Sequence, residues 1–242
     1  MNYSYSDEEF NNVAKEIYNL LTYNKNICNK KTAILTGGQP GSGKTTLQKI
    51  ALKNNPDIVV INGDEFREYH PRYKDIIRNE LDFVPFTQKF CNRMVEYLID
   101  KLSDERYCLL IEGTLRTTIV PLKTKIQLKE KDYKVELYVM AVSKELSWQG
   151  VINRYNDLLK IGGDARITSR KSHDYVVEHI SENVDYLFLN GNFDNIKLFT
   201  REKECIYDAK RDNTMPGVIL NKVLNDKNDR YFEKVRKNKF SR

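Results

Sequence analysis

A glycine-rich segment over residues 36–46 constrains the possible fold of this chain more than any other part of the sequence. From Gly38 to Thr45 it has the spacing G-x-x-x-x-G-K-T of a phosphate-binding loop. Its glycines can take backbone angles that are closed to other residues, so successive backbone N–H groups can point inward around an anion. The segment therefore predicts a binding site for a nucleoside triphosphate.

The side chains of this loop have separate expected roles. Lys44 reaches the outer phosphates, and Thr45 supplies a hydroxyl for Mg²⁺. The helix that begins here directs the positive end of its dipole at the phosphates. The chain contains no N-K-x-D motif, which reads guanine, so ATP is the expected nucleotide. The expected ATP-binding residues are Gly38, Gln39, Pro40, Gly41, Ser42, Gly43, Lys44, Thr45 and Thr46.

The flanks of the loop support this interpretation. Residues 32–35 form a short apolar run that reads as a buried strand. After the loop, Leu47, Ile50 and Ala51 recur at helical spacing until Pro56 prevents continuation. A strand, a glycine loop and a helix are the context in which the motif binds phosphate, and this disfavours a glycine-rich turn without a ligand.

Length and composition favour one domain. The chain has 242 residues, enough for a three-layer core, with 40% hydrophobic and 31% charged residues. We expect a single P-loop kinase domain over residues 1–242. It would have an amphipathic N-terminal helix at 6–22, a core over about 30–210 and a helical tail at 215–242. The expected fold class is α/β, with a mostly parallel central sheet and helices on both faces.

Composition also argues against several classes of protein. No apolar run approaches the roughly twenty residues of a membrane span, and the acidic start of the chain is unlike a signal peptide, so we expect a cytoplasmic protein without a membrane partner. The net charge of +6 is concentrated near the end of the chain. Such a run is more often a solvated face than a nucleic-acid site, so no nucleic-acid partner is expected. The widely separated cysteines are expected to be reduced thiols; they are Cys28, Cys91, Cys108 and Cys205.

Hydrophobic periodicity predicts the other elements. Ser6 and Glu9 form a capping box before the first helix. Further helices are expected around 86–102, 122–126, 146–159 and 176–187 and from 215 onward, and strands at 58–61, 108–112, 135–142, 196–199 and 205–207. The apolar positions that define these helices include Leu20, Ile126, Leu159 and Val218.

Carboxylates follow two of the predicted strands. Ligands of an open parallel sheet bind outside the carboxyl ends of its strands, so Asp64, just past the strand at 58–61, should share a crevice with the phosphate loop. We favour Asp64 as the base that a kinase acting on a hydroxyl needs; the alternative is a helix cap, and both roles can hold together. Glu112 ends the strand at 108–112 in the form of a Walker B element. It would organise Mg²⁺ or its water shell, or equally contact a substrate.

The roles of several other polar side chains stay open when the residues are considered alone. Glu96 lies off the apolar stripe of its helix, as an ordinary exposed residue would. Thr114 and Arg116 suit a polar ligand and a capped turn equally well. Arg154, and Arg166 after a pair of glycines, could close over a transferring phosphoryl group, although a solvated basic face is the better interpretation from the residues alone.

Several segments, in this order, resemble the zeta toxin family, the kinase component of bacterial epsilon/zeta toxin-antitoxin systems. The matching segments are GGQPGSGKT at 37–45, DEF at 64–66 with HP at 70–71, NRMVE at 92–96, IEGTLRT at 111–117, RY at 154–155, and AR at 165–166 before HD at 173–174. The resemblance covers about residues 30–210. The combination is far more specific than the phosphate-binding loop alone.

This resemblance implies an α/β P-loop kinase that uses ATP and Mg²⁺ to phosphorylate the 3′-hydroxyl of UDP-N-acetylglucosamine and so blocks cell-wall synthesis. It implies that Asp64 is the base and that Lys44, Arg154 and Arg166 stabilise the transferring phosphoryl group. The residues that it assigns to the sugar nucleotide are Asp64, Glu96, Glu112, Thr114, Arg116 and Thr124. It also implies a small helical antitoxin of the epsilon type that blocks the ATP site, with a heterotetramer as one form of the complex.

Two alternatives remain open. The phosphate loop and Asp64 would serve a kinase of any other small-molecule hydroxyl equally well. The chain could also be a nucleotide-binding partner of an antitoxin without activity, but all the expected catalytic residue types are present, which weighs against this. The resemblance includes His173 and Asp174 but gives them no chemistry.

Overall fold

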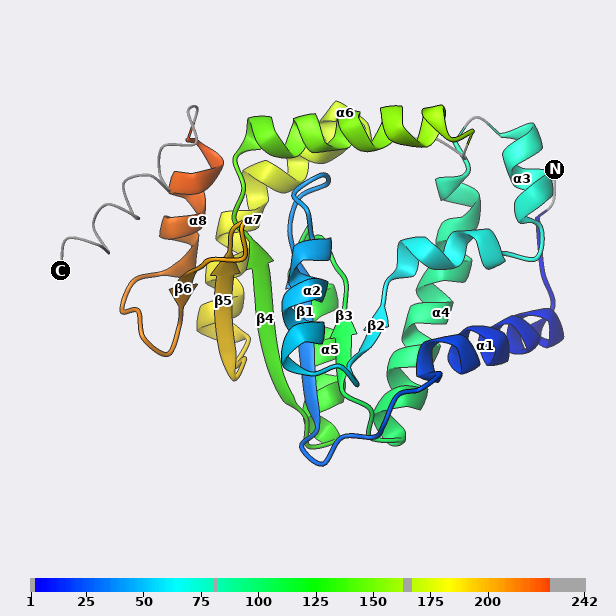
Figure 1. Ribbon diagram of the computed structural model, residues 1–242, viewed down its shortest axis with the longest axis horizontal. Helices are drawn as coiled ribbons and strands as arrows, with labels where there is room; N and C mark the ends of the chain where they lie inside the picture. Colours follow the sequence, from blue (N-terminus) through cyan, green and yellow to red (C-terminus); the bar gives the residue numbers. More distant parts are fainter. Residues whose placement is uncertain (1–2, 81, 163–166, 227–242) are drawn as a thin grey trace.

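The described part of the chain, residues 3–80, 82–162 and 167–226 of the computed structural model, contains a six-stranded sheet in the order β2-β3-β1-β4-β5-β6 (Figure 1). Strands β1 to β5 run parallel, and β6 pairs antiparallel with β5. The strands are β1 (Thr32–Gly37), β2 (Val59–Ile61), β3 (Leu109–Ile111), β4 (Lys134–Met140), β5 (Asn195–Phe199) and β6 (Cys205–Asp208). The expected α/β class with a mostly parallel sheet is confirmed.

Helices cover both faces of this sheet, with α2 on one face and α5 and α7 on the other (Figure 1). The helices are α1 (Asp7–Thr22), α2 (Thr45–Asn54), α3 (Tyr73–Asn79), α4 (Val84–Asp104), α5 (Ile119–Glu130), α6 (Lys144–Lys160), α7 (Arg170–Asn190) and α8 (Pro216–Leu224), with a 3-10 helix, η1 (Gly63–Tyr69). Because β1 is central, the loop that follows it lies in the middle of the sheet's carboxyl edge.

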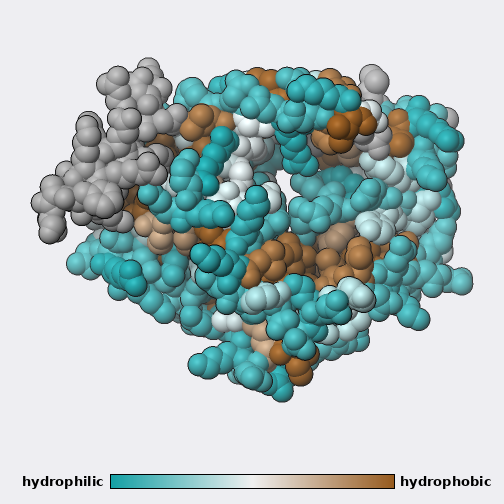
Figure 2. All heavy atoms as spheres, viewed as in Figure 1, coloured by the Kyte–Doolittle hydropathy of each residue, from teal (hydrophilic) through white to brown (hydrophobic). Residues whose placement is uncertain are grey.

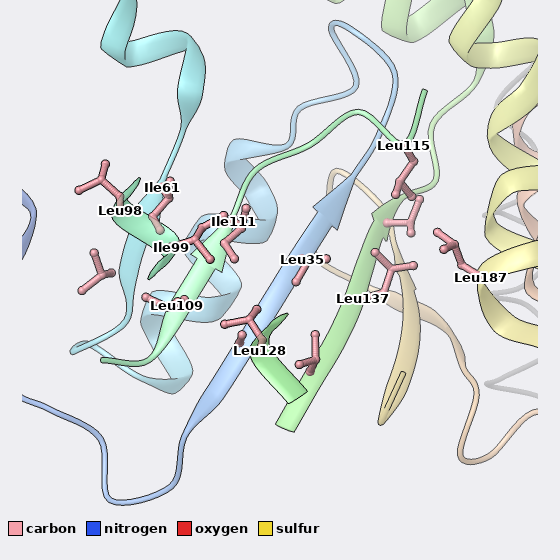
Figure 3. Packing of buried hydrophobic residues seen from close by; sticks show 14 of the residues in the cluster. Leu35, Ile61, Leu98, Ile99, Leu109, Ile111, Leu115, Leu128, Leu137 and Leu187 are labelled. Carbon is pink, nitrogen blue, oxygen red and sulfur yellow. The ribbon is translucent and has the colours of Figure 1, made fainter. Parts of the chain in front are cut away.

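The larger part of the core lies on the face covered by α4, α5 and α7. Leu35 of β1 pairs in register with Ile111 of β3 and Leu137 of β4, so the three side chains point to the same face. The helices add Ile99, Leu128 and Leu187 to them (Figure 3). Burying one such side chain contributes about 1.5–3 kcal/mol, so this layer holds the parallel strands together.

The opposite face of the sheet is covered by α2. Ile34 and Leu110 are neighbours in the register and point away from Leu35. Ala51 packs beside Leu110, and Leu47 packs beside Met140. The helix that begins at the phosphate loop is therefore anchored to the central strands, which holds its first turn in a fixed place.

Local sequence signals account for several helix boundaries. Ser6 Oγ accepts a hydrogen bond from Glu9 N at 3.1 Å, and Glu9 Oε2 accepts one from Ser6 N at 2.8 Å, so the predicted capping box is confirmed. Helix α2 ends at Asn54, just before Pro56. Helix α3 was not predicted, because its seven residues carry too short a pattern to show a period.

Several apolar positions that helped to define helices do not pack in the core. The exposed fractions are 61% for Leu20, 52% for Ile126, 52% for Leu159 and 47% for Val218. Helical spacing gives the angular position of a side chain, but how wide a sector of the helix is covered depends on its neighbours. Of the tail predicted over 215–242, the structure shows α8; residues 227–242 lie outside the described residues.

The expectation that all cysteines are reduced thiols is wrong for two of them. Cys28 and Cys108 form a disulfide, with 5.7 Å between their Cα atoms and a sequence separation of 80. They precede β1 and β3, which are neighbours in the sheet, and this adjacency is not visible in the sequence. Cys91 and Cys205 are free thiols. Over the described ranges, no helix has the length and apolarity to cross a membrane.

Candidate active site

The phosphate-binding loop joins β1 to α2 and is packed directly against α6. Gly41 and Gly43 have φ values of 73° and 88°, in the left-handed region that favours glycine. A Cβ atom on Gly41 would clash with the carbonyl oxygen of Ser147 and lie 2.6 Å from Val151 N. Glycine at position 41 thus serves both the turn of the loop and the close approach of α6.

The residues of the loop fit a triphosphate and Mg²⁺. Ser42 Oγ is buried and has no hydrogen-bond partner among the described residues, as a group awaiting a polar ligand would be. Thr45 is exposed at the start of α2. No described cluster of three or more His, Cys, Asp or Glu side chains could hold a metal ion. Mg²⁺ usually binds through one or two side chains, water and substrate phosphates, which a single hydroxyl beside the phosphates suits.

Lys44 is directed across the mouth of the loop. Its Nζ lies 3.4 Å from the carbonyl oxygen of Gly38 and 3.8 Å from Glu112 Oε1, and little of either charged side chain is exposed. Burial lowers the pKa of Lys44; the charges of Glu112 and Asp64 oppose this shift, and Arg154 adds to it. Three further charged groups of the predicted site therefore lie close enough to act on this ammonium.

Glu112 follows β3 at the carboxyl edge of the sheet, as the sequence predicted. Its backbone N–H donates to the carbonyl oxygen of Ile61 at the end of β2. Its Oε2 accepts a hydrogen bond from Gln48 Nε2 of α2 at 2.9 Å, while Oε1 faces Lys44. The carboxylate is held between two donors, in a position to face Mg²⁺, a phosphate-bound water or a substrate hydroxyl.

Asp64 lies in η1, directly after β2, with 64% of its side chain exposed. The helix cap is Asn62, whose side chain accepts a hydrogen bond from Asp64 N, so the capping alternative for Asp64 is wrong. Arg67 donates to Asp64 Oδ1 through Nη2 at 2.8 Å and Nε at 3.1 Å. The same guanidinium is held by Thr87 Oγ1 and Gln88 Oε1 of α4, both at 2.9 Å. Arg67 thus orients Asp64, a role that no sequence motif indicated.

Helix α6 crosses above the phosphate loop (Figure 1), and the face of the molecule is hollowed beneath it (Figure 2). Arg154 lies on this helix and is exposed. Its charge lowers the pKa of Lys44, so its guanidinium lies near this ammonium. Arg166 belongs to residues 163–166, which lie outside the described part of the chain.

Arg201, just after β5, bonds to the phosphate loop from its outer side. Its Nη2 donates to the carbonyl oxygens of Gly41 at 2.6 Å and Leu146 at 3.0 Å, and its Nε donates to that of Ser42 at 3.2 Å. A Cβ atom on Gly150 would lie 2.9 Å from Arg201 Nη2. Sequence reasoning missed Arg201; the available signal was a cation directly after a strand whose carboxyl end lies at the same edge.

The residues assigned to the acceptor come from α4, α5 and the segment after β3. Glu96 of α4 forms a salt bridge of 3.0 Å with Lys123 of α5, and both side chains are largely exposed. Thr124 is the next residue of α5 and is half-buried. Thr114, after β3, is exposed. The structure thus brings Glu96 close to the helix that carries Thr124.

Arg116 is associated with α7. Its guanidinium carbon lies 5.0 Å from the centre of the Tyr175 ring, a cation-π contact. Asn183 Nδ2 donates to the carbonyl oxygens of Leu115 at 2.9 Å and Arg116 at 3.2 Å, which holds this segment against α7. The contacts of the described residues do not link Arg116 to Lys44 or Asp64.

A parallel sheet with a phosphate-binding loop after its central strand, and carboxylates after the next two strands, defines a P-loop protein with a kinase-like fold. The sequence model of the family described as zeta toxin matches residues 18–212. The chain belongs to the zeta toxin family.

Named relatives and a solved structure agree with this assignment. The chain is 40% identical to Toxin PezT of Streptococcus pneumoniae serotype 4 over 223 residues, 91% of this chain and 88% of that protein. It is 36% identical to Toxin zeta of Streptococcus agalactiae over 227 residues, 92% of this chain and 79% of that protein. A solved structure from the PezAT chromosomal toxin-antitoxin system of Streptococcus pneumoniae superposes with a TM-score of 0.86 at 34% identity, covering 99% of this chain and 98% of that one.

Proposed function

We propose that this chain is a toxin kinase that transfers the γ-phosphoryl group of ATP to the 3′-hydroxyl of UDP-N-acetylglucosamine and thereby blocks cell-wall synthesis. The observation that carries the proposal is the gathering of charge around Lys44: Glu112 lies 3.8 Å away, and Asp64 and Arg154 act on the same ammonium. A base, a phosphate-binding cation and a second cation at one edge of the sheet are what phosphoryl transfer to an alcohol requires.

The reaction proposed for these residues is a single displacement. Asp64 accepts the proton of the acceptor hydroxyl as its oxygen bonds to the γ-phosphorus. The bond from this phosphorus to the β–γ bridging oxygen breaks, and ADP leaves with the electron pair. Lys44, Arg154 and Arg166 neutralise the charge on the transferring group. Mg²⁺, held through Thr45 and the phosphates, would supply further charge neutralisation.

The acceptor side of the proposal rests on a set of polar residues. Glu96, Glu112, Thr114, Arg116 and Thr124, together with Asp64, would hold the sugar nucleotide. Arg67 would keep Asp64 aimed at the acceptor hydroxyl, since two of its nitrogens bind that carboxylate. The reaction would take place in the cytoplasm, where ATP is available.

The direct test is incubation with ATP, Mg²⁺ and UDP-N-acetylglucosamine, followed by mass analysis and NMR of the product. We expect a gain of one phosphoryl group on the 3′-oxygen of the amino sugar, and no product from an analogue without that hydroxyl. Asp64→Asn and Lys44→Ala should each remove product formation. Turnover of a different alcohol with no change in UDP-N-acetylglucosamine would reject this substrate in favour of another small-molecule kinase.

A role without catalysis is tested in cells. If the chain acted only by binding a nucleotide and an antitoxin, Asp64→Ala and Lys44→Ala would arrest growth as the unaltered chain does. We expect both variants to be harmless on expression at equal protein levels, because growth arrest depends on the phosphorylated product.

We further propose a small helical antitoxin as the partner, in a complex that forms a heterotetramer. The 34% identical chain of the PezAT system belongs to a toxin-antitoxin pair, which supports this part of the proposal. The antitoxin would cover the ATP site, so its addition should abolish MgATP binding measured by calorimetry. Undiminished MgATP binding in the purified complex would contradict this arrangement.

A further inference from the structure

A buried chain of hydrogen bonds joins the first turns of α6 and α7. Ser147 Oγ lies 2.9 Å from His173 Nε2, and His173 Nδ1 lies 2.9 Å from Asp174 Oδ1. Ser147 and His173 have no exposed surface. Asp174 Oδ2 in turn faces Arg170 Nε at 3.0 Å and Lys144 Nζ at 3.4 Å. The chain therefore runs from a serine in the interior to two cations near the surface.

These three side chains do not form a nucleophilic triad. Ser147 has no surface that a substrate could reach, and its Oγ lies 3.0 Å from the carbonyl oxygen of Lys144 in the preceding turn. A catalytic serine needs an open face beside an oxyanion site. Instead, these hydrogen bonds attach the first turn of α6, at Ser147, to α7.

That point on α6 is the one that contacts the phosphate loop. A Cβ atom on Gly41 would clash with the carbonyl oxygen of Ser147, and a Cβ atom on Gly150 would clash with that of Gly41. The backbones of the loop and of this turn of α6 are in direct contact, and Arg201 bridges them through bonds to the carbonyl oxygens of Gly41 and Leu146, so a small shift of the helix would displace the loop. Arg154 lies seven residues after Ser147, two turns along the same side of the helix.

We propose that His173 is a positioning residue: by holding Ser147 it fixes α6 against the phosphate loop and so sets where Arg154 lies relative to the phosphates. This inference rests on the proposed function, because it assigns Arg154 to the transferring phosphoryl group. His173 itself touches no reacting atom.

The protonation of the imidazole suits this role. Asp174 accepts a hydrogen bond from Nδ1, so the neutral ring carries its proton there and Nε2 is an acceptor that shares the single Ser147 hydroxyl proton with the carbonyl oxygen of Lys144. Burial lowers the pKa of His173, while Asp174 opposes this shift and Arg170 and Lys144 add to it. The neutral ring links both partners at neutral pH without placing a further cation beside the loop.

Two substitutions of His173 distinguish the hydrogen bond at Nε2 from the hydrogen bond at Nδ1. His173→Gln keeps an amide at the distance of Nε2 and can still bind Ser147, whereas His173→Asn reaches only toward Asp174. We expect His173→Asn and Ser147→Ala to lower kcat for phosphoryl transfer by about 10-fold to 100-fold, and His173→Gln to retain most of it. The matched control is His179→Gln, on the outer part of the same helix, where Nδ1 contacts the carbonyl oxygen of Tyr175; it should leave kcat unchanged.

The decisive measurement is a double-mutant cycle with Arg154→Ala. If His173 acts through Arg154, the loss of kcat caused by His173→Asn should shrink to less than about 2-fold in the Arg154→Ala background. Independent losses that multiply in the double variant would overturn the inference, as would equal losses for His173→Asn and His173→Gln that follow the fraction of folded protein.

A measurement that needs no acceptor substrate tests the role of His173 separately from the proposed function. Amide hydrogen exchange in α6 should accelerate in His173→Asn and Ser147→Ala but not in His179→Gln, whatever the substrate of the enzyme is. Unchanged exchange would reject the role of His173. If hydrogen exchange in α6 is accelerated in His173→Asn and Ser147→Ala, but the unaltered chain does not phosphorylate UDP-N-acetylglucosamine, only the proposed substrate is rejected.

Discussion

Arg201 Nη2 lies 2.6 Å from the carbonyl oxygen of Gly41, so a guanidinium from the end of β5 binds the outer side of the phosphate loop. A second hydrogen bond, from Arg201 Nε to the carbonyl oxygen of Ser42, turns the next carbonyl of the loop toward Arg201 as well. With these carbonyl oxygens directed outward at Arg201, N–H groups of the loop can face the phosphates, apart from that of Ser42, which donates to the carbonyl oxygen of Gln39. The loop that the sequence identified is thus held by a residue about 160 positions away.

Arg201→Ala should weaken MgATP binding on the order of 10-fold or more, because charge-assisted bonds to three carbonyl oxygens are lost. The MgATP affinity of Arg201→Lys should lie between those of the unaltered chain and Arg201→Ala, since lysine keeps the positive charge but not the several N–H donors of the guanidinium. Calorimetric titration with MgATP measures the effect, and Arg211→Ala, at an exposed arginine beyond β6, is the matched control. Equal affinities for Arg201→Ala and Arg211→Ala would show that the loop does not depend on Arg201.

Lys44→Met should abolish phosphoryl transfer and yet stabilise the nucleotide-free protein. Burial lowers the pKa of Lys44, which means that the folded chain holds this charge less favourably than the unfolded chain does. Removing a charge that is costly to bury should raise Tm by a few degrees, at about 2–4 °C per kcal/mol for a chain of this size. Thermal unfolding of Lys44→Met and of Lys49→Met, at an exposed position of α2, measures the difference. A lower Tm for Lys44→Met would mean that the ion pair with Glu112 outweighs the burial.

Stability should decrease as the pH falls below about 6.5, because two buried histidines would have to become charged. Burial lowers the pKa of His70 and of His173, with Arg72 adding to the first shift and Asp174 opposing the second. Between the lowered folded pKa and the ordinary value the unfolded chain binds more protons, so each histidine contributes a slope of up to about 1.4 kcal/mol per pH unit.

Urea unfolding at pH 7.5 and pH 5.0 tests this, and the double variant His70→Gln/His173→Gln should show a flatter dependence. Asp174 does not interfere in this range. Burial raises its pKa, but bonds from His173 and Arg170 outweigh burial and lower the pKa from 3.8 to about 2, so its contribution is lost progressively as the pH falls from about 4 to about 2. A dependence that the double variant leaves intact would assign the loss of stability to other groups.

Reduction of the Cys28–Cys108 disulfide should lower the free energy of unfolding by about 4 kcal/mol, as expected for a cross-link that closes a loop of 80 residues. Urea unfolding with and without reductant measures this difference. Cys205→Ser, which alters an exposed free thiol, should leave the effect of reductant unchanged. An equal sensitivity to reductant in Cys28→Ser would show that the disulfide is not its source.

The sequence predicted the parts of the fold that depend on neighbouring residues. The phosphate loop, the capping box of Ser6 and Glu9, the strand before Glu112 and the helix end near Pro56 each follow from spacing within about a dozen positions. The positions of Asp64 and Glu112 at one edge followed as well, because the carboxyl ends of parallel strands meet there.

Contacts between distant segments were not predictable in the same way. Arg67 and Arg201 carry no motif. Arg67 binds Asp64 three residues away but is held in place by Thr87, 20 residues away, and Arg201 binds Gly41, 160 residues away. The disulfide was missed for the same reason, since only the order of strands brings Cys28 to Cys108. Helical spacing placed Leu159 on an apolar stripe, but 52% of it is exposed among the described residues.

The sequence by itself therefore determined that this chain has a phosphate-binding loop after a buried strand, an α/β fold and the motifs of the zeta toxin family. Only the tertiary structure decided what holds that loop: Arg201 on its outer side, α6 packed against Gly41, and Ser147 bonded to His173. The physical reason is that a loop's conformation follows from local backbone freedom, whereas its support comes from side chains that the sheet order brings together from distant parts of the chain.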